Sequence, residues 1–504
     1  MVFDLETIAD RPDASDHEIV QIGAVRVNED GRLEEFNTLV RPERRLPSHI
    51  AEMTGLEYGD LEFAPSPERA LEEFFEWVGE RPTVAHNGFG YDFIVLDAAA
   101  SAAGLDVQRG SRLDTLELAH LVFPRAGANV VRSVDGSRPP AGRDLDELAV
   151  LAGLGARAKH DALTDARITR TVMLTLLEEL NRPTPARQLQ RWVLGRARHP
   201  WSDFLDSQPD PIALASVVPE VPGSPPIAPS GSLDIADIVA AFGDGGSLMT
   251  GDRTPRPQQA EMAELVSHAF ARPEQRLMIE APTGTGKTLA YLYPAIEAAR
   301  ASGRLTVVAP HSRVLQDQIL ETLEGLEPVL APFSVVVLKG RRNYVSLNSL
   351  QREIEAFADE TVGSPADHET AIALSILCSW VAQTPTGDWA DLRCNAIDER
   401  LTALQFLRWK LRVESTPGPV QDPLDRLDFY RRARAKLSRA HVAVLNHALL
   451  ASGPALDGRE FNLLVDEAHD LEDSITAACT KQVDVVQLEQ LCAAIWIRIT
   501  AAVW

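Results

Sequence analysis

The sequence has few cysteines, no long apolar run and a deficit of basic residues. Its four cysteines, Cys378, Cys394, Cys479 and Cys492, are not closely spaced, which argues against a disulfide framework and favours a reducing cytoplasm. No apolar run approaches the roughly 20 residues that a membrane-spanning helix needs. The N-terminus lacks a basic region followed by an apolar stretch, so we expect no secretory signal.

The length of 504 residues predicts two or three domains. Residues 1–181 alternate short apolar runs with helical patterns, which is typical of an α/β domain. The apolar runs predict strands at Val20–Val27 and Thr83–Ala85. Helical periodicity predicts helices at Pro67–Val78 and Ala162–Leu180.

Residues 182–254 have the composition of a linker with a short helix. Five prolines lie within 219–229 and a glycine-rich stretch covers 243–251, which favours extended, solvated backbone. Arg187–Leu205 carries Trp192, Trp201 and Phe204 among several arginines. This segment could bind nucleic acid, but we favour an aromatic face that packs on a neighbouring domain.

Strand–loop–helix units return in residues 255–504. The predicted strands are Leu277–Glu280, Leu305–Ala309 and Asn462–Asp466. The predicted helices are Lys287–Arg300 and Arg313–Leu323. Residues from about 340 to 440 are rich in helical patterns and are predicted to be an insertion into a parallel-sheet domain.

Two carboxylates lie close to the N-terminus on a predicted strand. Asp4 and Glu6 are two residues apart, so both face one side of the strand while Phe3 and Leu5 face the core. Side-by-side carboxylates repel each other unless a cation lies between them, and Mg²⁺ or Mn²⁺ binds oxygen ligands of this kind. Any single Asp-x-Glu pair is usually a solvated face, so the assignment depends on further elements.

Two such elements follow. His86–Asp92 opens a helix after a strand and offers Asp92, and His160 lies just ahead of a helix that carries Asp165 in its first turns. Four carboxylates and a histidine suit two-metal hydrolysis of a phosphodiester. The histidine can take a proton from the attacking water.

These three elements resemble those of the DnaQ-like (DEDDh) 3′→5′ exonucleases, over residues 1 to about 180. The resemblance implies a ribonuclease-H-like fold in which Asp4 bridges two metals. It implies that Glu6 and Asp165 hold the metal that binds water, that Asp92 holds the other metal, and that His160 is the general base. Only three residues precede Asp4, so we expect the true start to lie upstream.

Residues 281–288 form a phosphate-binding loop of the P-loop type. Gly284 and Gly286 let backbone N–H groups turn toward phosphate oxygens, Lys287 reaches the β- and γ-phosphates, and Thr288 ligates Mg²⁺. Much later, Asp466 and Glu467 follow an apolar run, where they would hold Mg²⁺ through water and orient the attacking water. The residues expected to bind ATP are Gln259, Thr283, Gly284, Thr285, Gly286, Lys287, Thr288, Asp466, Glu467 and His469.

This second region resembles the first RecA-like domain of superfamily 2 DEAH helicases, in the DinG branch related to XPD. The resemblance is carried by the strings at 339–344, 429–434, 445–450 and 466–469, besides the phosphate-binding loop. It implies that Gln259 reads adenine and that Pro310–Gln318 contacts single-stranded DNA. The chain is therefore expected to be α/β, with a ribonuclease-H-like exonuclease domain at 1–181, a linker at 182–254 and a RecA-like P-loop domain with a helical insertion at 255–504.

Two departures from that branch shape the expectations. Cysteines are missing from the positions that hold an iron–sulfur cluster, so no cluster is expected, and Cys378 and Cys394 are interpreted as buried small apolar side chains. The chain ends about 35 residues after His469, so a second RecA-like domain is expected to be absent. We therefore expect ATP binding with very slow hydrolysis and no duplex unwinding.

The resemblances imply DNA processing of the repair or replication type on single-stranded DNA or 3′ ends. The net charge of −24 alone would argue against a nucleic-acid partner, but the motifs outweigh it, and we expect a weak, salt-sensitive affinity. Two alternatives remain open. The chain could be an RNA exonuclease, or its C-terminal half could be a nucleotide-dependent DNA-binding module that does not unwind.

Overall fold

The structure is a computed structural model of the chain. The residues that it describes are 1–9, 13–28, 30–106, 110–127, 140–155, 160–206, 209–220, 229, 231–249, 253–272, 275–282, 284–326, 328–330, 332–359, 364–394, 397, 400–414, 419–452, 456 and 460–480. Thr283 and Cys492, named above, lie outside these ranges. No helix of the described part combines the length and the apolar character that a membrane crossing would require.

The chain divides into two compact units that do not follow the sequence order. The described residues of 1–221 and 341–430 form the first unit, and those of 222–340 and from 431 onward form the second. The domain boundaries predicted from the sequence stay predictions. Most residues of the predicted insertion, 341–430, pack with residues 1–221.

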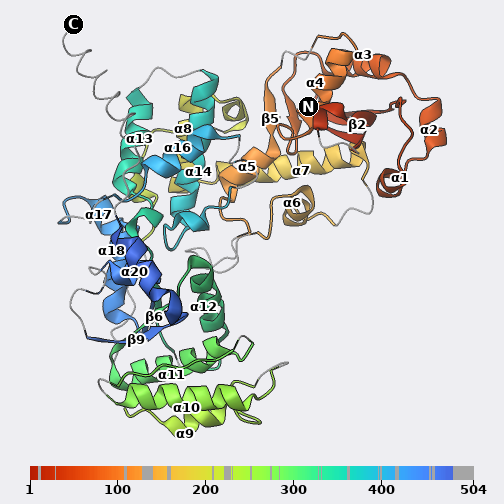
Figure 1. Ribbon diagram of the computed structural model, residues 1–504. Coiled ribbons are helices and arrows are strands. Elements are labelled where there is room, and N and C mark those ends of the chain that lie inside the picture. Colours follow the sequence, from red (N-terminus) through yellow and green to blue (C-terminus); the bar gives the residue numbers. More distant parts are fainter. Residues whose placement is uncertain are drawn as a thin grey trace. The chain divides into compact units, whose positions relative to one another are not determined.

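The first unit is built on a mixed five-stranded sheet with strand order β3-β2-β1-β4-β5 (Figure 1). The strands are β1 (Val2–Ile8), β2 (Glu18–Val27), β3 (Leu33–Leu39), β4 (Thr83–Ala85) and β5 (Arg112–Asp114). Strands β1, β2 and β3 pair antiparallel, whereas β4 and β5 join in parallel. The two strands predicted in this region are thus confirmed, with β2 starting two residues earlier than predicted.

Helices pack on this sheet through aromatic and aliphatic side chains. The helices up to residue 181 are α1 (Ser48–Thr54), α2 (Tyr58–Glu62), α3 (Pro67–Val78), α4 (Asp92–Ala102), α5 (Thr115–Val122), α6 (Leu145–Leu151) and α7 (Ala162–Asn181). Phe3 of β1 contacts Phe74 of α3 and Phe93 of α4, with ring centroids 5.8 and 5.6 Å apart. Helix α7 instead packs along β1 and β2. Both predicted helices, α3 and α7, are confirmed.

The predicted linker begins with residues that pack in the first unit. Helix α8 (Pro185–Arg196) lies against α14 (Pro365–Gln383), and Trp201 is fully buried. Phe204, by contrast, is 37% exposed, so the favoured interpretation of this segment, an aromatic face that packs on a neighbouring domain, stays a prediction. The other helices of this part are α13 (Leu347–Asp359), α16 (Thr402–Lys410), α17 (Pro423–Leu427) and α18 (Phe429–Lys436), which continues into the second unit. Cys378 and Cys394 are buried, as predicted.

The second unit contains a four-stranded parallel sheet with order β7-β8-β6-β9. Its strands are β6 (Leu305–Ala309), β7 (Val335–Val337), β8 (Val442–Val444) and β9 (Phe461–Val465). Its helices are α9 (Ile235–Ala241), α10 (Pro257–Ala271), α11 (Lys287–Ser302), α12 (Arg313–Leu326), α19 (His447–Ala451) and α20 (Leu471–Cys479). Strands β7 and β8 are neighbours, so the chain leaves this sheet after Val337 and returns to it at Val442. The mixed α/β class is confirmed, and the insertion at about 340–440 stays a prediction.

One predicted strand is wrong. Residues 277–280, which precede the phosphate-binding loop, have no strand structure, and Met278 is 93% exposed. A strand needs a hydrogen-bonded neighbour and at least one buried face. A four-residue apolar run has neither guarantee, since its pattern carries no information on its partners.

The first prediction concerns a buried ion pair within the first unit. Arg125, which follows α5, is fully buried and donates from Nε and Nη2 to the Asp391 carboxylate at 2.7 and 2.9 Å. Arg125→Met leaves that carboxylate buried without its cation, so the unfolding free energy should fall by about 3–5 kcal/mol. Denaturation followed by tryptophan fluorescence measures it, since six of the eight tryptophans lie in residues 1–430.

A double variant provides the control. Arg125→Met combined with Asp391→Leu removes both charges, so it should recover most of the lost stability. If the single variant is as stable as the wild type, the ion pair does not hold this part of the unit together.

The second prediction concerns Glu117 of α5, whose carboxylate accepts a hydrogen bond from Trp201 Nε1 at 3.2 Å. Burial, followed by repulsion from Asp114, raises the pKa of Glu117 to about 8 from 4.5. The folded protein therefore holds a proton that the unfolded chain releases, and stability falls as the pH rises from about 4.5 to 8. Glu117→Gln should be more stable than the wild type at pH 8, by about 1–3 kcal/mol, and nearly equal to it at pH 5. A gain of the same size at both pH values would contradict this account.

Candidate active sites

The predicted nuclease residues meet in one cleft of about 530 Å³. Asp4 and Glu6 come from β1, Asp92 begins α4, His160 precedes α7 and Asp165 lies in its first turn. The alternation expected of a strand is observed, since Phe3 and Leu5 lie in the hydrophobic core of the opposite face. All five residues assigned from the sequence therefore line the same site.

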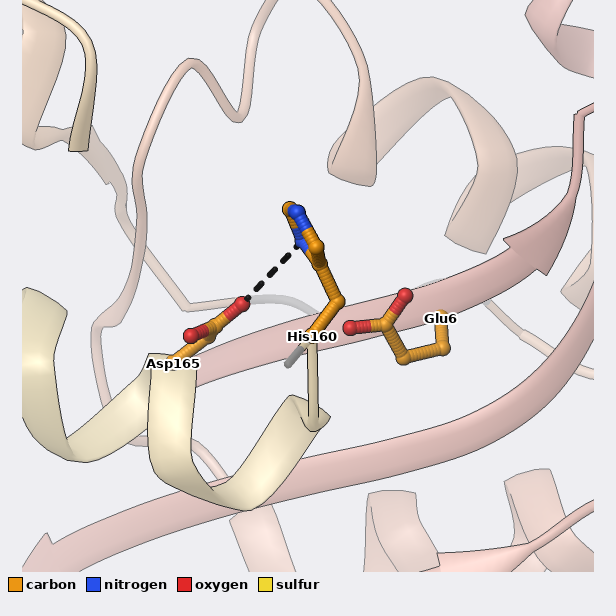
Figure 2. Close-up of side chains that lie close together, drawn as sticks. All are labelled: Glu6, His160 and Asp165. Carbon is orange, nitrogen blue, oxygen red and sulfur yellow. Dashed lines mark ion pairs between the residues drawn. The ribbon is translucent and has the colours of Figure 1, made fainter. Parts of the chain in front are cut away.

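Three of these side chains come especially close together (Figure 2). Single ligand atoms of Glu6, His160 and Asp165 all lie within 4.8 Å of one another. His160 Nδ1 is 3.7 Å from Asp165 Oδ2, and the histidine side chain is 41% exposed whereas Glu6 and Asp165 are buried. Two buried carboxylates beside an accessible imidazole make a suitable binding place for a divalent cation.

The start of α7 is fixed by a close approach to β2. Asp161 caps the helix by accepting a hydrogen bond from the Thr164 N–H at 2.9 Å, and its other oxygen accepts one from Gln21 Nε2 at 3.0 Å. A Cβ at Gly23 would lie 2.1 Å from the Leu163 nitrogen, so a larger residue there would push the helix away. This position determines where His160 and Asp165 lie, and the sequence analysis did not identify it.

Asp92 is buried at the end of a turn that another carboxylate holds. Asp114, at the end of β5, accepts hydrogen bonds from the Asn87 and Phe89 N–H groups at 2.8 and 3.2 Å. Asn87 has a left-handed φ of 58°, which asparagine tolerates better than most residues. Burial, followed by repulsion from Asp114, raises the pKa of Asp92 to about 7. The raised pKa thus reflects mainly the removal of the Asp92 carboxylate from water.

Further polar residues that the sequence analysis did not assign line the same cleft. Tyr91 hydrogen-bonds through its hydroxyl to Thr7 Oγ1 at 2.5 Å and to His17 Nδ1 at 2.8 Å, and burial raises its pKa. His120 and Arg143 also line this cleft, and burial keeps the pKa of His120 well below its usual value. The one feature of the sequence that indicates Tyr91 as a cleft residue is its position next to Asp92.

The phosphate-binding loop of the second unit has the backbone that its glycines predict. Gly284 and Gly286 have φ values of 83° and 79°, in the left-handed region that glycine favours, and α11 begins at Lys287. Lys287 Nζ lies 3.2 Å from Glu467 Oε1. The DEAH segment, residues 466–469, is thus within reach of the phosphate-binding loop, although Lys287 and Glu467 are 180 residues apart in sequence.

Other predicted nucleotide-binding residues contact the same loop. Gln259 Nε2 donates to the Gly286 carbonyl at 2.9 Å, and Thr285 Oγ1 donates to the Pro282 carbonyl at 2.9 Å. Gln259 therefore supports the loop directly, in addition to any adenine contact. His469 is 72% exposed and its Nδ1 lies 3.5 Å from Glu467 Oε2.

Tyr291 was not identified from the sequence. Its hydroxyl donates to Asp466 Oδ2 at 3.0 Å and interacts with Thr288, one turn earlier on α11. Burial and the neighbouring Asp466 raise its pKa, so the tyrosine stays protonated and can only donate to that carboxylate. Thr288 and Asp466, the two predicted Mg²⁺ ligands of this site, thus both contact the Tyr291 hydroxyl.

Comparisons with known proteins associate the carboxylate cleft and the phosphate-binding loop with two different families. Residues 1–173 match the family model described as Exonuclease, and residues 256–400 match the model described as DEAD/DEAH box helicase. A protein named 3'-5' exonuclease DinG from Bacillus subtilis is 26% identical over 97% of this chain and 51% of its own length. A protein of the same name from Staphylococcus haemolyticus is 24% identical over 97% of this chain and 52% of its own. The chain thus spans about half the length of these relatives.

Solved structures with similarity include Exonuclease X in complex with DNA, at 21% identity and a TM-score of 0.26 over 35% of this chain and 90% of that one. An Escherichia coli ExoI–ssDNA complex gives 13% identity and a TM-score of 0.31 over 86% of this chain and 90% of that one. Residues 1–173 are thus similar to an exonuclease family and residues 256–400 to the DEAD/DEAH box helicases, and relatives named 3'-5' exonuclease DinG align along 97% of this chain.

Proposed function

We propose that this chain is a metal-dependent 3′→5′ exonuclease that acts on DNA, joined to an ATP-binding helicase-type domain. The observation that carries the proposal is the convergence of Asp4, Glu6, Asp92, His160 and Asp165 on one cleft. The name of the relatives, 3'-5' exonuclease, supports the direction of cleavage. A role in DNA repair or replication follows from the pairing of the two activities.

The cleft fits divalent metal ions of the Mg²⁺ or Mn²⁺ type. Its carboxylates offer the hard oxygen ligands that these ions prefer, and Glu6 and Asp165 lie within ligand distance of each other. Asp4 and Asp92 would supply the remaining carboxylate ligands of the metal ions. When bound, such ions neutralise the phosphate charge and lower the pKa of a water molecule.

His160 is the residue placed to move a proton. Its side chain is accessible at the mouth of the cleft, where it can accept the proton of the attacking water. The Asp165 carboxylate, 3.7 Å from His160 Nδ1, favours one orientation of the imidazole. The buried carboxylates and the accessible base thus have separate tasks, one for binding and one for proton transfer.

The second unit is proposed to bind Mg²⁺–ATP through Gly284, Gly286, Lys287 and Thr288, with Asp466 and Glu467 at the γ-phosphate. The support is the left-handed loop glycines at the start of α11 and the DEAH segment within 3.2 Å of the loop lysine. Bound nucleotide would replace the Lys287–Glu467 contact with contacts to phosphate oxygens.

The third prediction tests the nuclease. With Mn²⁺, the purified chain should shorten single-stranded DNA from its 3′ end, and chelation should stop the reaction. Asp4→Asn and Asp165→Asn should reduce the rate to background, because each removes a charged ligand from the cleft. His160→Ala should retain slow cleavage, about 10²–10⁴-fold below wild type, because water can then lose its proton only to solvent.

The assay uses matched strands labelled at either end, together with an RNA strand of the same sequence. Glu72→Gln, an exposed carboxylate change on α3, is the control and should keep full activity. Degradation from the 5′ end, or none at all, would contradict the proposed activity. Preference for the RNA strand would replace DNA by RNA as the substrate.

The fourth prediction tests the nucleotide site. Lys287→Ala should weaken binding of a fluorescent ATP analogue at least tenfold, because the ammonium group reaches the β- and γ-phosphates. Arg304→Ala, which breaks the surface ion pair with Glu460, is the control and should bind like wild type. Equal binding by Lys287→Ala and wild type would show that this loop does not hold the phosphates.

A further inference from the structure

One buried carboxylate holds the turn that leads to Asp92. Asp114 is 0% exposed and accepts hydrogen bonds from three backbone N–H groups, those of Asn87, Phe89 and Leu116, at 2.8, 3.2 and 2.8 Å. Two of these donors belong to the turn before α4, and the third begins α5. Because three backbone N–H groups share this one acceptor, the position of the Asp114 side chain determines the geometry of the turn.

The cation that faces this carboxylate comes from the inserted segment, residues 341–430. Arg400 Nη1 lies 3.6 Å from Asp114 Oδ2, and the arginine side chain is 30% exposed. Arg112, only two residues before Asp114 in sequence, pairs with Asp97 instead. A buried carboxylate without a cation nearby is costly, so the contact with Arg400 favours the position of the Asp114 side chain on which the turn depends.

The inserted segment is fixed against the nuclease part by buried hydrogen bonds. Gln190 Nε2 of α8 donates to the Ser375 carbonyl of α14 at 2.9 Å, and Arg187 Nη1 donates to Ser379 Oγ at 3.0 Å. Gln383 Nε2 donates to the Val122 carbonyl at the end of α5 at 3.1 Å. Because the groups in these hydrogen bonds are shielded from water, a variant that breaks one of the bonds leaves a polar atom without a partner. These bonds hold α14, which belongs to the same inserted segment as Arg400, against α5 and α8.

We propose that Arg400 is a positioning residue of the exonuclease site, supplied by the segment inserted between helicase strands β7 and β8. The proposal rests on the exonuclease function proposed above. Arg400 holds Asp114, Asp114 holds the turn at 87–91, and this turn determines the position of Asp92. Arg400 itself does not touch the nucleic acid. Its loss should therefore slow the chemical step while leaving the affinity for the DNA strand nearly unchanged.

The fifth prediction follows for the full chain with Mn²⁺ and single-stranded DNA. Arg400→Ala should lower kcat about 10- to 100-fold, the range found when a residue that orients a metal ligand is lost, and change KM less than about twofold. The Mn²⁺ concentration for half-maximal activity should rise, since Asp92 is then less well placed. Arg400→Lys should recover part of kcat, and added guanidinium ion should partly restore Arg400→Ala.

Arg196→Ala is the matched control. Arg196 also joins the nuclease part to the inserted segment, through a hydrogen bond from Nη2 to the Ala358 carbonyl at 2.9 Å. This variant should keep the wild-type kcat and Mn²⁺ dependence even where its melting temperature falls. If both arginine variants lose activity in proportion to their melting temperatures, Arg400 has only a structural role and the proposal is overturned.

A double-variant cycle isolates the route through Asp114. Asp114→Asn together with Arg400→Ala should be no slower than Asp114→Asn alone, because the arginine then has no charge to hold. Additive losses would overturn the proposal. An active wild type with an equally active Arg400→Ala would overturn this inference only, whereas an inactive wild type would overturn the exonuclease function and this inference with it.

Discussion

Repulsion among buried carboxylates is the constraint on which the nuclease part depends. Glu6, Asp92 and Asp165 are each at most 6% exposed and line one cleft, and the raised pKa of Asp92 reports the cost of their burial. Left to themselves, such groups would turn toward water or take up protons. The fold prevents the first outcome and a bound cation would prevent the second. A site that is costly when empty of positive charge is also one that binds positive charge tightly.

The backbone of β1, β2 and α7 holds these carboxylates close together. Strand β1 is hydrogen-bonded on both sides, by β2 and β4, and Phe3 anchors it to the core through two aromatic contacts. On the other side, the glycine at position 23 lets the start of α7 lie directly on β2. The carboxylates thus project from elements whose own stability comes from packing elsewhere. Their repulsion is offset by that packing, and none of them needs a flexible loop to reach the cleft.

Much of this could be predicted from the sequence, for reasons that differ between residues. Asp4 and Glu6 were predictable because strand periodicity places alternate residues on one face, and the phosphate-binding loop because its glycines specify a backbone. The strand predicted at 277–280 failed because a short apolar run does not reveal its partners. Asp114 and Arg400 left no local signal at all, since their roles arise from a contact between residues far apart in sequence.

The inserted segment shows how sequence order and compactness can disagree. The helicase model matches through residue 400, yet residues 341–430 pack with the nuclease part. The chain consequently passes between the two units three times, near residues 221, 340 and 430, where a simple fusion would pass once. Each additional passage ties a nuclease-side segment covalently to a helicase-side strand. A fragment that ended with α7 or α8 would keep every cleft carboxylate but lose α14 and Arg400. All residues of the cleft therefore lie before residue 181, whereas the compact unit that holds them also needs residues 341–430.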